Sequence, residues 1–254
     1  MSTTEGVTNV VNGDGTCETM DLTDISNFDL PIDVEADKVV YVREVKEETF
    51  TVCLPYDLPV PENTTAYFLD VTDGEGVTLQ EVEGVMEAYQ PYVLVVNEQS
   101  AAHAYHRTDE ASAYVVDLGM TNVTFSHTAE AGSVERDNFT LCGTMHTMTH
   151  EEGLAMKAYV LQPDNSWRIT ASSDPEMAQK PYLAPFQAYL LYTGHGEMDE
   201  VATTFDSITT CVQPAKPDDK VSSETGWYDL SGRKLGGKPT RKGVYLHQRK
   251  VVVH

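Results

Sequence analysis

The chain has 254 residues, of which 41% are hydrophobic and 9% aromatic, a composition typical of proteins that fold around a buried core. Seventeen Lys and Arg against 40 Asp and Glu give a formal net charge of −23 at pH 7, which repels phosphate backbones and argues against nucleic acid as a partner. No run of about 18 apolar residues is present, so we expect no membrane-spanning helix.

Residues 1–16 have neither the basic start nor the apolar centre of a signal peptide. We expect this segment to be flexible. We also expect the chain to be a mature or truncated form, from which the signal peptide of an exported protein is missing.

Alternation of apolar and polar residues dominates residues 17–212 and predicts β-strands. In residues 49–54 (TFTVCL), Phe50, Val52 and Leu54 fall on one face of such a strand. Residues 91–96 (PYVLVV) are apolar without interruption, which is typical of a strand buried on both faces.

Residues 159–171 predict a β-hairpin, because two strand-like runs flank the turn residues 163–165 (Pro-Asp-Asn). Residues 70–76 (DVTDGEG) loosely resemble a calcium loop, but a hairpin turn is the favoured interpretation. No long window has helical periodicity, and short strands recur about every eight to twelve residues. These patterns predict an all-β protein with an antiparallel, β-sandwich-like body over residues 17–212.

The composition changes after residue 212. Residues 213–225 are rich in Pro, Lys, Asp and Ser and are typical of a linker. Residues 226–254 contain two strand-like segments with turns at 231–232 and 248–249, which predict a small C-terminal β-hairpin tail. From residue 213 onward the chain holds nine basic and four acidic residues, so residues 1–212 carry eight basic and 36 acidic residues.

The four cysteines, Cys17, Cys53, Cys142 and Cys211, lie far apart and form no CxxC pair. This spacing argues against a zinc ribbon or a redox motif and leaves the disulfide state open. Cys53 lies within an apolar run, which favours a small buried hydrophobic residue over a reactive thiol.

His146 and His150 are four residues apart, with Glu151 adjacent, and on a helix such a pair could hold a metal in a hydrolase. The flanking sequence is strand-like, however, and a spacing of four on a strand spans about 13 Å. An exposed polar loop is therefore the favoured interpretation.

A second group, His103, His106, Asp109 and Glu110, lies in a polar connection between strands and has no recognised ligand spacing. No nucleophile elbow, phosphate-binding loop or dinucleotide fingerprint occurs in the chain. We therefore predict no catalytic residue, no metal site and no cofactor.

Aromatic side chains could stack on sugar rings if they are exposed. The candidate ligand-binding residues are Tyr89, Tyr105, Trp167 and Tyr192. Trp167 alternates with the apolar residue Ile169, so core packing is the favoured interpretation at that position.

The C-terminal 29 residues are similar to the ends of secreted and surface proteins of Bacteroidetes such as Prevotella and Bacteroides. In those proteins a "YdLqGrrv…kGlYiv" pattern marks the last strands of a type IX secretion-type sorting domain. The matching positions here are Tyr228, Gly232, Gly243, Tyr245 and Lys250. The matched part is shorter than a full sorting domain, and the resemblance implies recognition by export machinery.

The body resembles a module of the same surface proteins with an "LPF…PYL…PFRAY" pattern. The matching segments, in chain order, are "CETMDLTDISNFDLPIDVEADKVVYVRE", "FTVCLPYDL", "MEAYQPYVLVV", "FTLCGTM", "AYVLQPDNSW" and "LAPFQAYLL". Phe50 stands where the pattern usually has Trp, and Gln187 where it has Arg. Both departures weaken any inference about a specific pocket.

The resemblance implies a non-catalytic, secreted or cell-surface module used in adhesion, glycan contact or surface display in a gut or oral bacterium. Its expected partners are host or dietary glycans, surface proteins and the export machinery. Two alternatives stay open: a glycoside-active or metal-dependent hydrolase, and a purely structural spacer.

Overall fold

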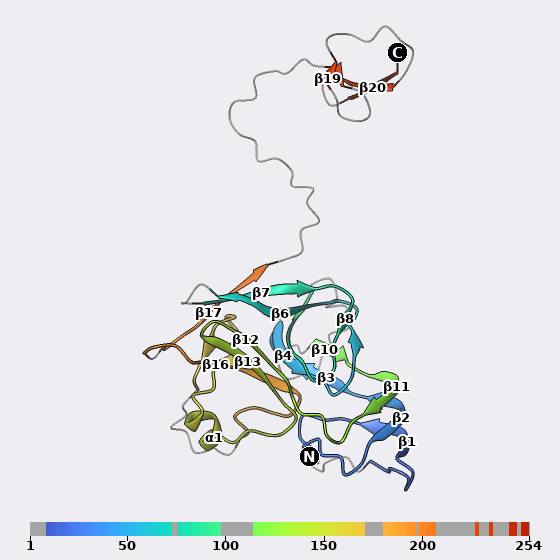
Figure 1. Cartoon of the computed structure of the whole chain (residues 1–254), viewed down its shortest axis with the longest axis vertical. Helices are drawn as coiled ribbons and strands as arrows, with labels where there is room; N and C mark the ends of the chain where they lie inside the picture. The colour runs from blue at the N-terminus through green and yellow to red at the C-terminus, as the bar shows by residue number, and fades with distance from the viewer. Residues whose placement is uncertain are drawn as a thin grey trace, which may run out of the picture. The chain divides into compact units, whose positions relative to one another are not determined.

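The computed structural model describes four C-terminal strands and, in the rest of the chain, residues 9–72, 76–97, 114–170, 180–196 and 198–206. The chain divides into two compact units, Met1–Ile208 and Thr209–His254, close to the boundary predicted after residue 212. It is built mostly of strands with almost no helix, which confirms the predicted all-β class (Figure 1). In the described part, no helix is long and apolar enough to cross a bilayer.

The described residues of the larger unit form three sheets of three or more strands. The central sheet has five strands, in the order β17 (Ala202–Asp206), β7 (Gly76–Val82), β6 (Thr64–Thr72), β9 (Pro91–Val96) and β4 (Thr49–Cys53). The second sheet has three strands, in the order β12 (Ser133–Arg136), β13 (Phe139–Thr144) and β16 (Gln187–Tyr192). The third has the order β1 (Thr16–Asp21), β2 (Val34–Val40) and β11 (Met120–Phe125).

Shorter antiparallel strand pairs lie in the segments that connect these sheets. They are β3 (Val42–Val45) with β10 (Tyr114–Asp117), β5 (Leu58–Pro59) with β8 (Val85–Met86), and β14 (Val160–Leu161) with β15 (Trp167–Arg168). The last pair is the hairpin predicted over residues 159–171, and Asn165 in its turn has φ +63°. The DVTDGEG segment begins in β6 and ends in β7, and these consecutive strands pair antiparallel, which confirms the hairpin predicted there.

Most strand pairs are antiparallel, as predicted, but two are parallel: β1 with β2, and β17 with β7. Antiparallel neighbours need only a short turn, whereas a parallel pair requires the chain to cross back to its starting end. Residues 22–33 make this crossing between β1 and β2, and they form a long irregular loop.

The central sheet is buried on both faces, as the apolar run at 91–96 predicts. Successive residues of a strand point to opposite faces, so Val93 lies in one core and Leu94 in the other. Figure 1 shows β12, β13 and β16 on one side of the central strands and β1, β2 and β11 on the other. The result is a sandwich with a further sheet packed against it.

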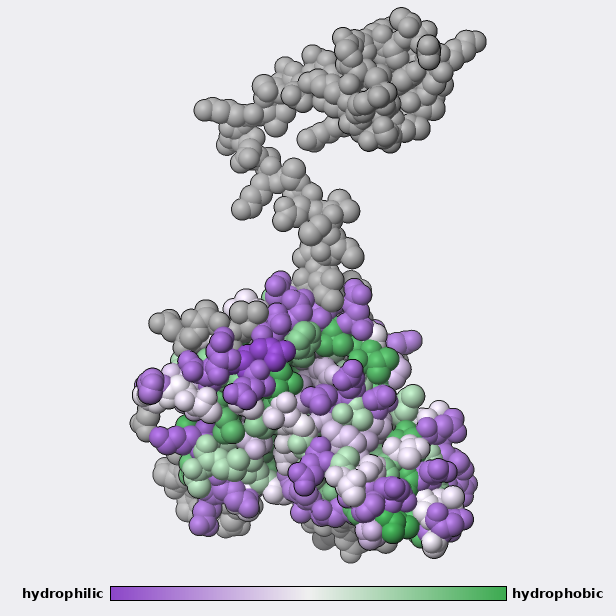
Figure 2. Space-filling view, in the orientation of Figure 1, coloured by the Kyte–Doolittle hydropathy of each residue, from purple (hydrophilic) through white to green (hydrophobic). Residues whose placement is uncertain are grey.

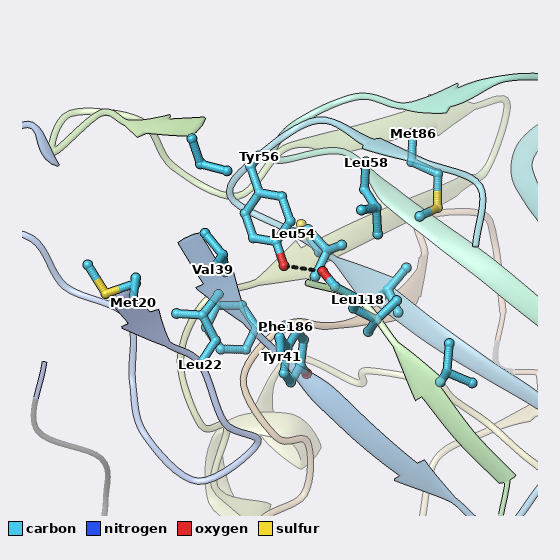
Figure 3. Packing of buried hydrophobic residues seen from close by; sticks show 14 of the residues in the cluster. Met20, Leu22, Val39, Tyr41, Leu54, Tyr56, Leu58, Met86, Leu118 and Phe186 are labelled. Atoms are coloured by element: carbon cyan, nitrogen blue, oxygen red, sulfur yellow. Dashed lines mark hydrogen bonds between the residues drawn. The ribbon is translucent and has the colours of Figure 1, made fainter. Parts of the chain in front are cut away.

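The larger core lies between the central and third sheets, and Figure 3 shows part of it. Met20, Leu54, Leu118 and Phe186 pack together there, and the buried hydroxyl of Tyr56 donates a hydrogen bond of 2.6 Å to the carbonyl of Leu118. A buried hydroxyl needs such a partner to offset its desolvation. Outside this core, hydrophilic residues cover much of the visible face of the unit, in keeping with its acidic composition (Figure 2).

A short helix, α1 (His150–Ala155), covers the outer face of the second sheet together with a third apolar cluster. Thr149 and Glu152 form a capping box, in which each side chain accepts the backbone N–H of the other residue. The Thr-x-x-Glu spacing of a capping box is present in the sequence and is typical of a helix start, although an exposed polar loop was predicted at this position.

Residues 1–16 are predicted to be flexible, and in the structure the described part of this segment contacts β1 and the core. The side chain of Asn9 donates to the carbonyl of Asp21 at 2.9 Å and accepts from the N–H of Asp21 at 2.7 Å. Val11 packs against the larger core. These contacts hold residues 9–16 to β1, and residues 1–8 lie outside the described part.

Cys17, Cys53 and Cys142 are free thiols, and Cys211 lies outside the described residues. Burial raises the pKa of Cys53 to about 12, and its Sγ donates to the carbonyl of Tyr89 at 3.2 Å. This confirms Cys53 as an unreactive core residue. A Cβ at Gly143 would lie 2.2 Å from that sulfur, so only glycine fits at Gly143.

The smaller unit is one antiparallel sheet in the order β19 (Lys234–Leu235), β18 (Trp227–Tyr228), β20 (Val244–His247) and β21 (Lys250–Val253). The hairpin predicted around residues 248–249 is present between β20 and β21. The tail therefore contains a four-stranded sheet, of which the predicted hairpin is one part. Tyr228, Tyr245 and Lys250 lie on its strands, and Gly232 and Gly243 lie outside the described residues.

Candidate functional site

Three loops meet beside the ends of the strands in the larger unit. They are residues 22–33 between β1 and β2, 126–132 between β11 and β12, and 145–149 between β13 and α1. Between them lies a depression of about 430 Å³, whose lining includes Phe28, Asp29, His127, Glu130, Met145 and His146. We call it the histidine groove.

A second hollow, of about 490 Å³, has a mainly aliphatic and aromatic lining contributed by β5, β9 and β10. Its charged lining residues are Glu62 and Asp117. The histidine groove is the hollow in which imidazole and carboxylate groups meet, so its chemistry is considered in detail.

His127 is bound to Asp33 on the opposite loop. Its Nδ1 lies 2.7 Å from Oδ1 of Asp33, and its backbone N–H donates to the same oxygen at 2.9 Å. These hydrogen bonds, the imidazole contact first, hold the pKa of Asp33 below its ordinary value of 3.8. Both side chains are exposed, by 43% and 64% respectively, and His127 is the one that lines the groove.

His146 is bound in the same way to Asp29, with Nε2 2.7 Å from Oδ1. Its side chain is 50% exposed. His150, its predicted partner, instead stacks edge-on against Tyr182 with ring centroids 5.2 Å apart. The structure therefore does not join the two histidines. Among the described residues, no group of three or more His, Cys, Asp or Glu could hold a metal ion.

Hydrogen bonds from backbone N–H groups connect the same loops. The N–H of Phe28 donates to the carbonyl of Met145 at 3.0 Å, and the N–H of Thr147 donates to Oδ1 of Asn27 at 2.8 Å. The ring of Phe28 lies against Phe125, with centroids 5.3 Å apart. The loop at 22–33 is thus anchored to the core although it has no regular secondary structure.

A buried arginine anchors the start of that loop. Arg43 is only 2% exposed, and its Nη2 and Nε lie 2.7 and 3.1 Å from Oδ1 of Asp24. Its Nη1 donates to the carbonyl of Thr51 at 2.8 Å, and the guanidinium also contacts the hydroxyl of Tyr41. The guanidinium carbon lies 5.7 Å from the ring centroid of Phe50. A buried cation is tolerated here because its donors are satisfied.

Residues 22–33 therefore carry three aspartates, each bound by a side chain from a different element. Arg43 binds Asp24, His146 binds Asp29 and His127 binds Asp33. We call residues 22–33 the three-aspartate loop. Of these six residues, only His146 was a predicted candidate, because the contacts join positions far apart in the chain.

Trp167 is fully buried, and its Nε1 donates to Oγ1 of Thr203 at 3.0 Å. Its candidacy as a ligand-stacking residue is therefore wrong, because no face of the indole reaches solvent. The alternative interpretation, core packing, is confirmed. Tyr105 and the group His103, His106, Asp109 and Glu110 lie outside the described residues.

The two remaining tyrosines do not share a surface. Tyr89 is half-buried beside the histidine groove, and its hydroxyl donates to the carbonyl of Ser126 at 3.4 Å. Tyr192 pairs with Phe139 at the start of β13, whereas the groove adjoins the end of that strand. Of the predicted aromatic residues that the structure describes, only Tyr89 is thus close to the candidate site.

The fold and this groove define an all-β protein of two units with a polar, loop-built depression on the larger one. Comparison of the chain with protein-family models, with curated proteins and with solved structures finds no match. The resemblance to Bacteroidetes surface proteins therefore stays a prediction.

Proposed function

We propose that the chain is a non-catalytic, exported module of a Bacteroidetes-type surface protein, and that it contacts a hydroxyl-rich ligand, such as a glycan, in the histidine groove. The observation that carries the proposal is the polar groove itself, built from three loops that are fixed to a rigid β scaffold. Binding residues are commonly placed on loops held in this way.

The chemistry of the groove supports binding rather than hydrolysis. A glycosidase needs two carboxyl groups that flank the scissile bond, one of them with a raised pKa. Here Asp29 and Asp33 each hold a histidine, and the pKa of Asp33 is lowered. These carboxylates act as hydrogen-bond acceptors that orient the imidazole rings.

The groove also favours a neutral ligand. Carboxylates accept hydrogen bonds from sugar hydroxyls, and imidazole and hydroxyl groups can both donate to them and accept from them. The described lining residues include neither Lys nor Arg, so a sulfated or otherwise anionic ligand would gain no ion pair with a lysine or arginine there. Host or dietary glycans fit this chemistry better than acidic polymers do.

A glycan and mucin array tests the proposal with the whole chain. Glu130 lines the groove, and Glu130→Gln is expected to weaken binding about tenfold, because one charge-assisted hydrogen bond is lost. Glu135→Gln, an exposed change on β12 outside the groove lining, is the matched control. Silence on the whole array would favour the spacer, and release of free sugar would favour a hydrolase.

The smaller unit carries the export part of the proposal. It has its own sheet, and nine basic against four acidic residues give it a positive charge opposite to that of the body. We expect a chain truncated after Ile208 to keep its melting temperature within about 1 °C, because the chain divides into two compact units at this position.

In a Bacteroidetes host, the same truncation is expected to abolish delivery to the cell surface. Surface labelling of intact cells measures delivery, and thermal unfolding of the two purified chains measures stability. Normal surface delivery of the truncated chain would contradict a sorting role for the tail.

A further inference from the structure

The turn that leads into β1 contains a residue pair that is prone to a spontaneous reaction. Asn12 is followed by Gly13, and of the eight asparagines in the chain it is the one that precedes a glycine. The side-chain carbonyl of an asparagine lies within reach of the next backbone nitrogen, and a following glycine leaves that nitrogen unhindered because it has no Cβ. The pair can therefore cyclise with loss of ammonia.

The structure leaves this pair open to the reaction. Asn12 and Gly13 are both exposed, and a Cβ at Gly13 would have no neighbour within 4 Å. Within the described part of the chain, no hydrogen bond occupies the N–H of Gly13. Water can thus reach the attacking nitrogen, which does not first have to lose a hydrogen-bond partner.

Hydrogen bonds hold Asn12 in the turn. Its N–H donates to the carbonyl of Thr16 at 2.8 Å, and its carbonyl accepts from the N–H of Gly15 at 3.0 Å. Its side-chain Nδ2 donates to Oγ1 of Thr16 at 2.8 Å. The side-chain amide is therefore held within the turn that also contains the attacking nitrogen.

The adjacent pair, Asp14 and Gly15, is protected from the same reaction. Oδ1 of Asp14 accepts hydrogen bonds from Oγ1 and from the backbone N–H of Thr16, at 2.7 and 3.1 Å. These hydrogen bonds hold the pKa of Asp14 below its ordinary value of 3.8, and a charged carboxylate resists attack by a nitrogen. The N–H of Gly15 is also occupied, by the carbonyl of Asn12. The structure thus distinguishes two pairs that look alike in the sequence.

We propose that Asn12 is a site of spontaneous deamidation, which converts it to aspartate and isoaspartate in the folded protein. The backbone nitrogen of Gly13 loses its proton to hydroxide and bonds to Cγ of Asn12. The bond from Cγ to Nδ2 breaks, and the leaving group takes a proton from water and departs as ammonia. Water then opens the cyclic succinimide at one or the other of its carbonyl carbons, which gives aspartate or isoaspartate.

The product cannot replace a hydrogen bond of the turn. The hydroxyl proton of Thr16 is donated to Asp14, so Oγ1 of Thr16 serves as the acceptor for Nδ2 of Asn12. A carboxylate at position 12 has no proton to donate there, and its negative charge is repelled by the carboxylate of Asp14. Deamidation therefore loosens the turn before β1 and makes the chain more negative.

Peptide mapping tests the proposal with the whole folded chain. After incubation at pH 9, cleavage at glutamates releases residues 6–18, in which we expect a mass gain of about 1 Da at position 12 and labelling by an isoaspartate-specific methyltransferase. The reaction is expected to be slower at pH 6, because the attacking nitrogen must lose its proton. Asn9, which precedes Val10 and bonds to Asp21 through its side chain, is the unreacted reference in the same peptide.

Gly13→Ala is the matched variant. The added methyl group has no neighbour within 4 Å, so we expect the fold to be kept, but it hinders the attacking nitrogen and is expected to slow deamidation about tenfold. Equal rates in this variant and the wild type would overturn the proposal. An Asn12 that stays intact in the folded chain would overturn it as well, and the free peptide of residues 6–18, incubated in parallel, would show whether the fold protects it.

Discussion

Replacement of Arg43 by Met is expected to lower the free energy of unfolding of the larger unit by about 2 to 3 kcal/mol, because buried acceptors lose a charged donor, whereas the carboxylate of Asp24 is 37% exposed and can be solvated. Met fills much of the same space but provides no donor. The carbonyl of Thr51, the hydroxyl of Tyr41 and the carboxylate of Asp24 would each lose a partner. Urea unfolding monitored by circular dichroism measures the loss.

Two further substitutions show whether the effect comes from the guanidinium. Arg43→Lys keeps the charge but not the fork of donors, so an intermediate loss is expected. Arg136→Met removes an exposed arginine on β12 and is expected to change stability by no more than about 0.5 kcal/mol. If Arg43→Met matched Arg136→Met, the buried network would contribute little to stability.

Trp167→Ala is expected to destabilise the larger unit by about 3 to 5 kcal/mol, because it opens a cavity in the core between the central and second sheets. Trp167→Phe keeps an aromatic ring and loses the hydrogen bond to Thr203, so a loss of about 1 to 2 kcal/mol is expected. Chemical denaturation of both variants against the wild type gives the two values.

The same burial changes how Trp167 variants are interpreted in a binding assay. Loss of glycan binding by Trp167→Ala would report unfolding rather than a missing contact, and Glu130→Gln is the informative variant. A Trp167→Ala chain of normal stability would contradict the core-packing role of the indole.

Strands and hairpins were predictable because their signals are local. Side chains alternate along a strand, so the pattern at 49–54 and the apolar run at 91–96 identify β4 and β9 without knowledge of their neighbours. Turn residues at 163–165 and 248–249 place two hairpins for the same reason. The helix α1 was missed because it has six residues, too few to show a periodic apolar face.

The candidate site was much less predictable. The sequence suggests His150, four residues away, as the partner of His146. The structure instead pairs His146 with Asp29 at a separation of 117 residues. His127 and Asp33 are 94 residues apart, and no sequence motif links them. Such pairs depend on which loops the sheets bring together, and no local pattern records that.

The sequence alone determined the all-β class, the change from an acidic body to a basic tail, and most hairpins, since each follows from composition or from short-range alternation. The tertiary structure decided the parallel pairs, the burial of Arg43 and Trp167, and the meeting of three aspartates with an arginine and two histidines. The physical reason is that burial and ion pairing depend on distances across sheets, which the order of residues along one strand does not contain.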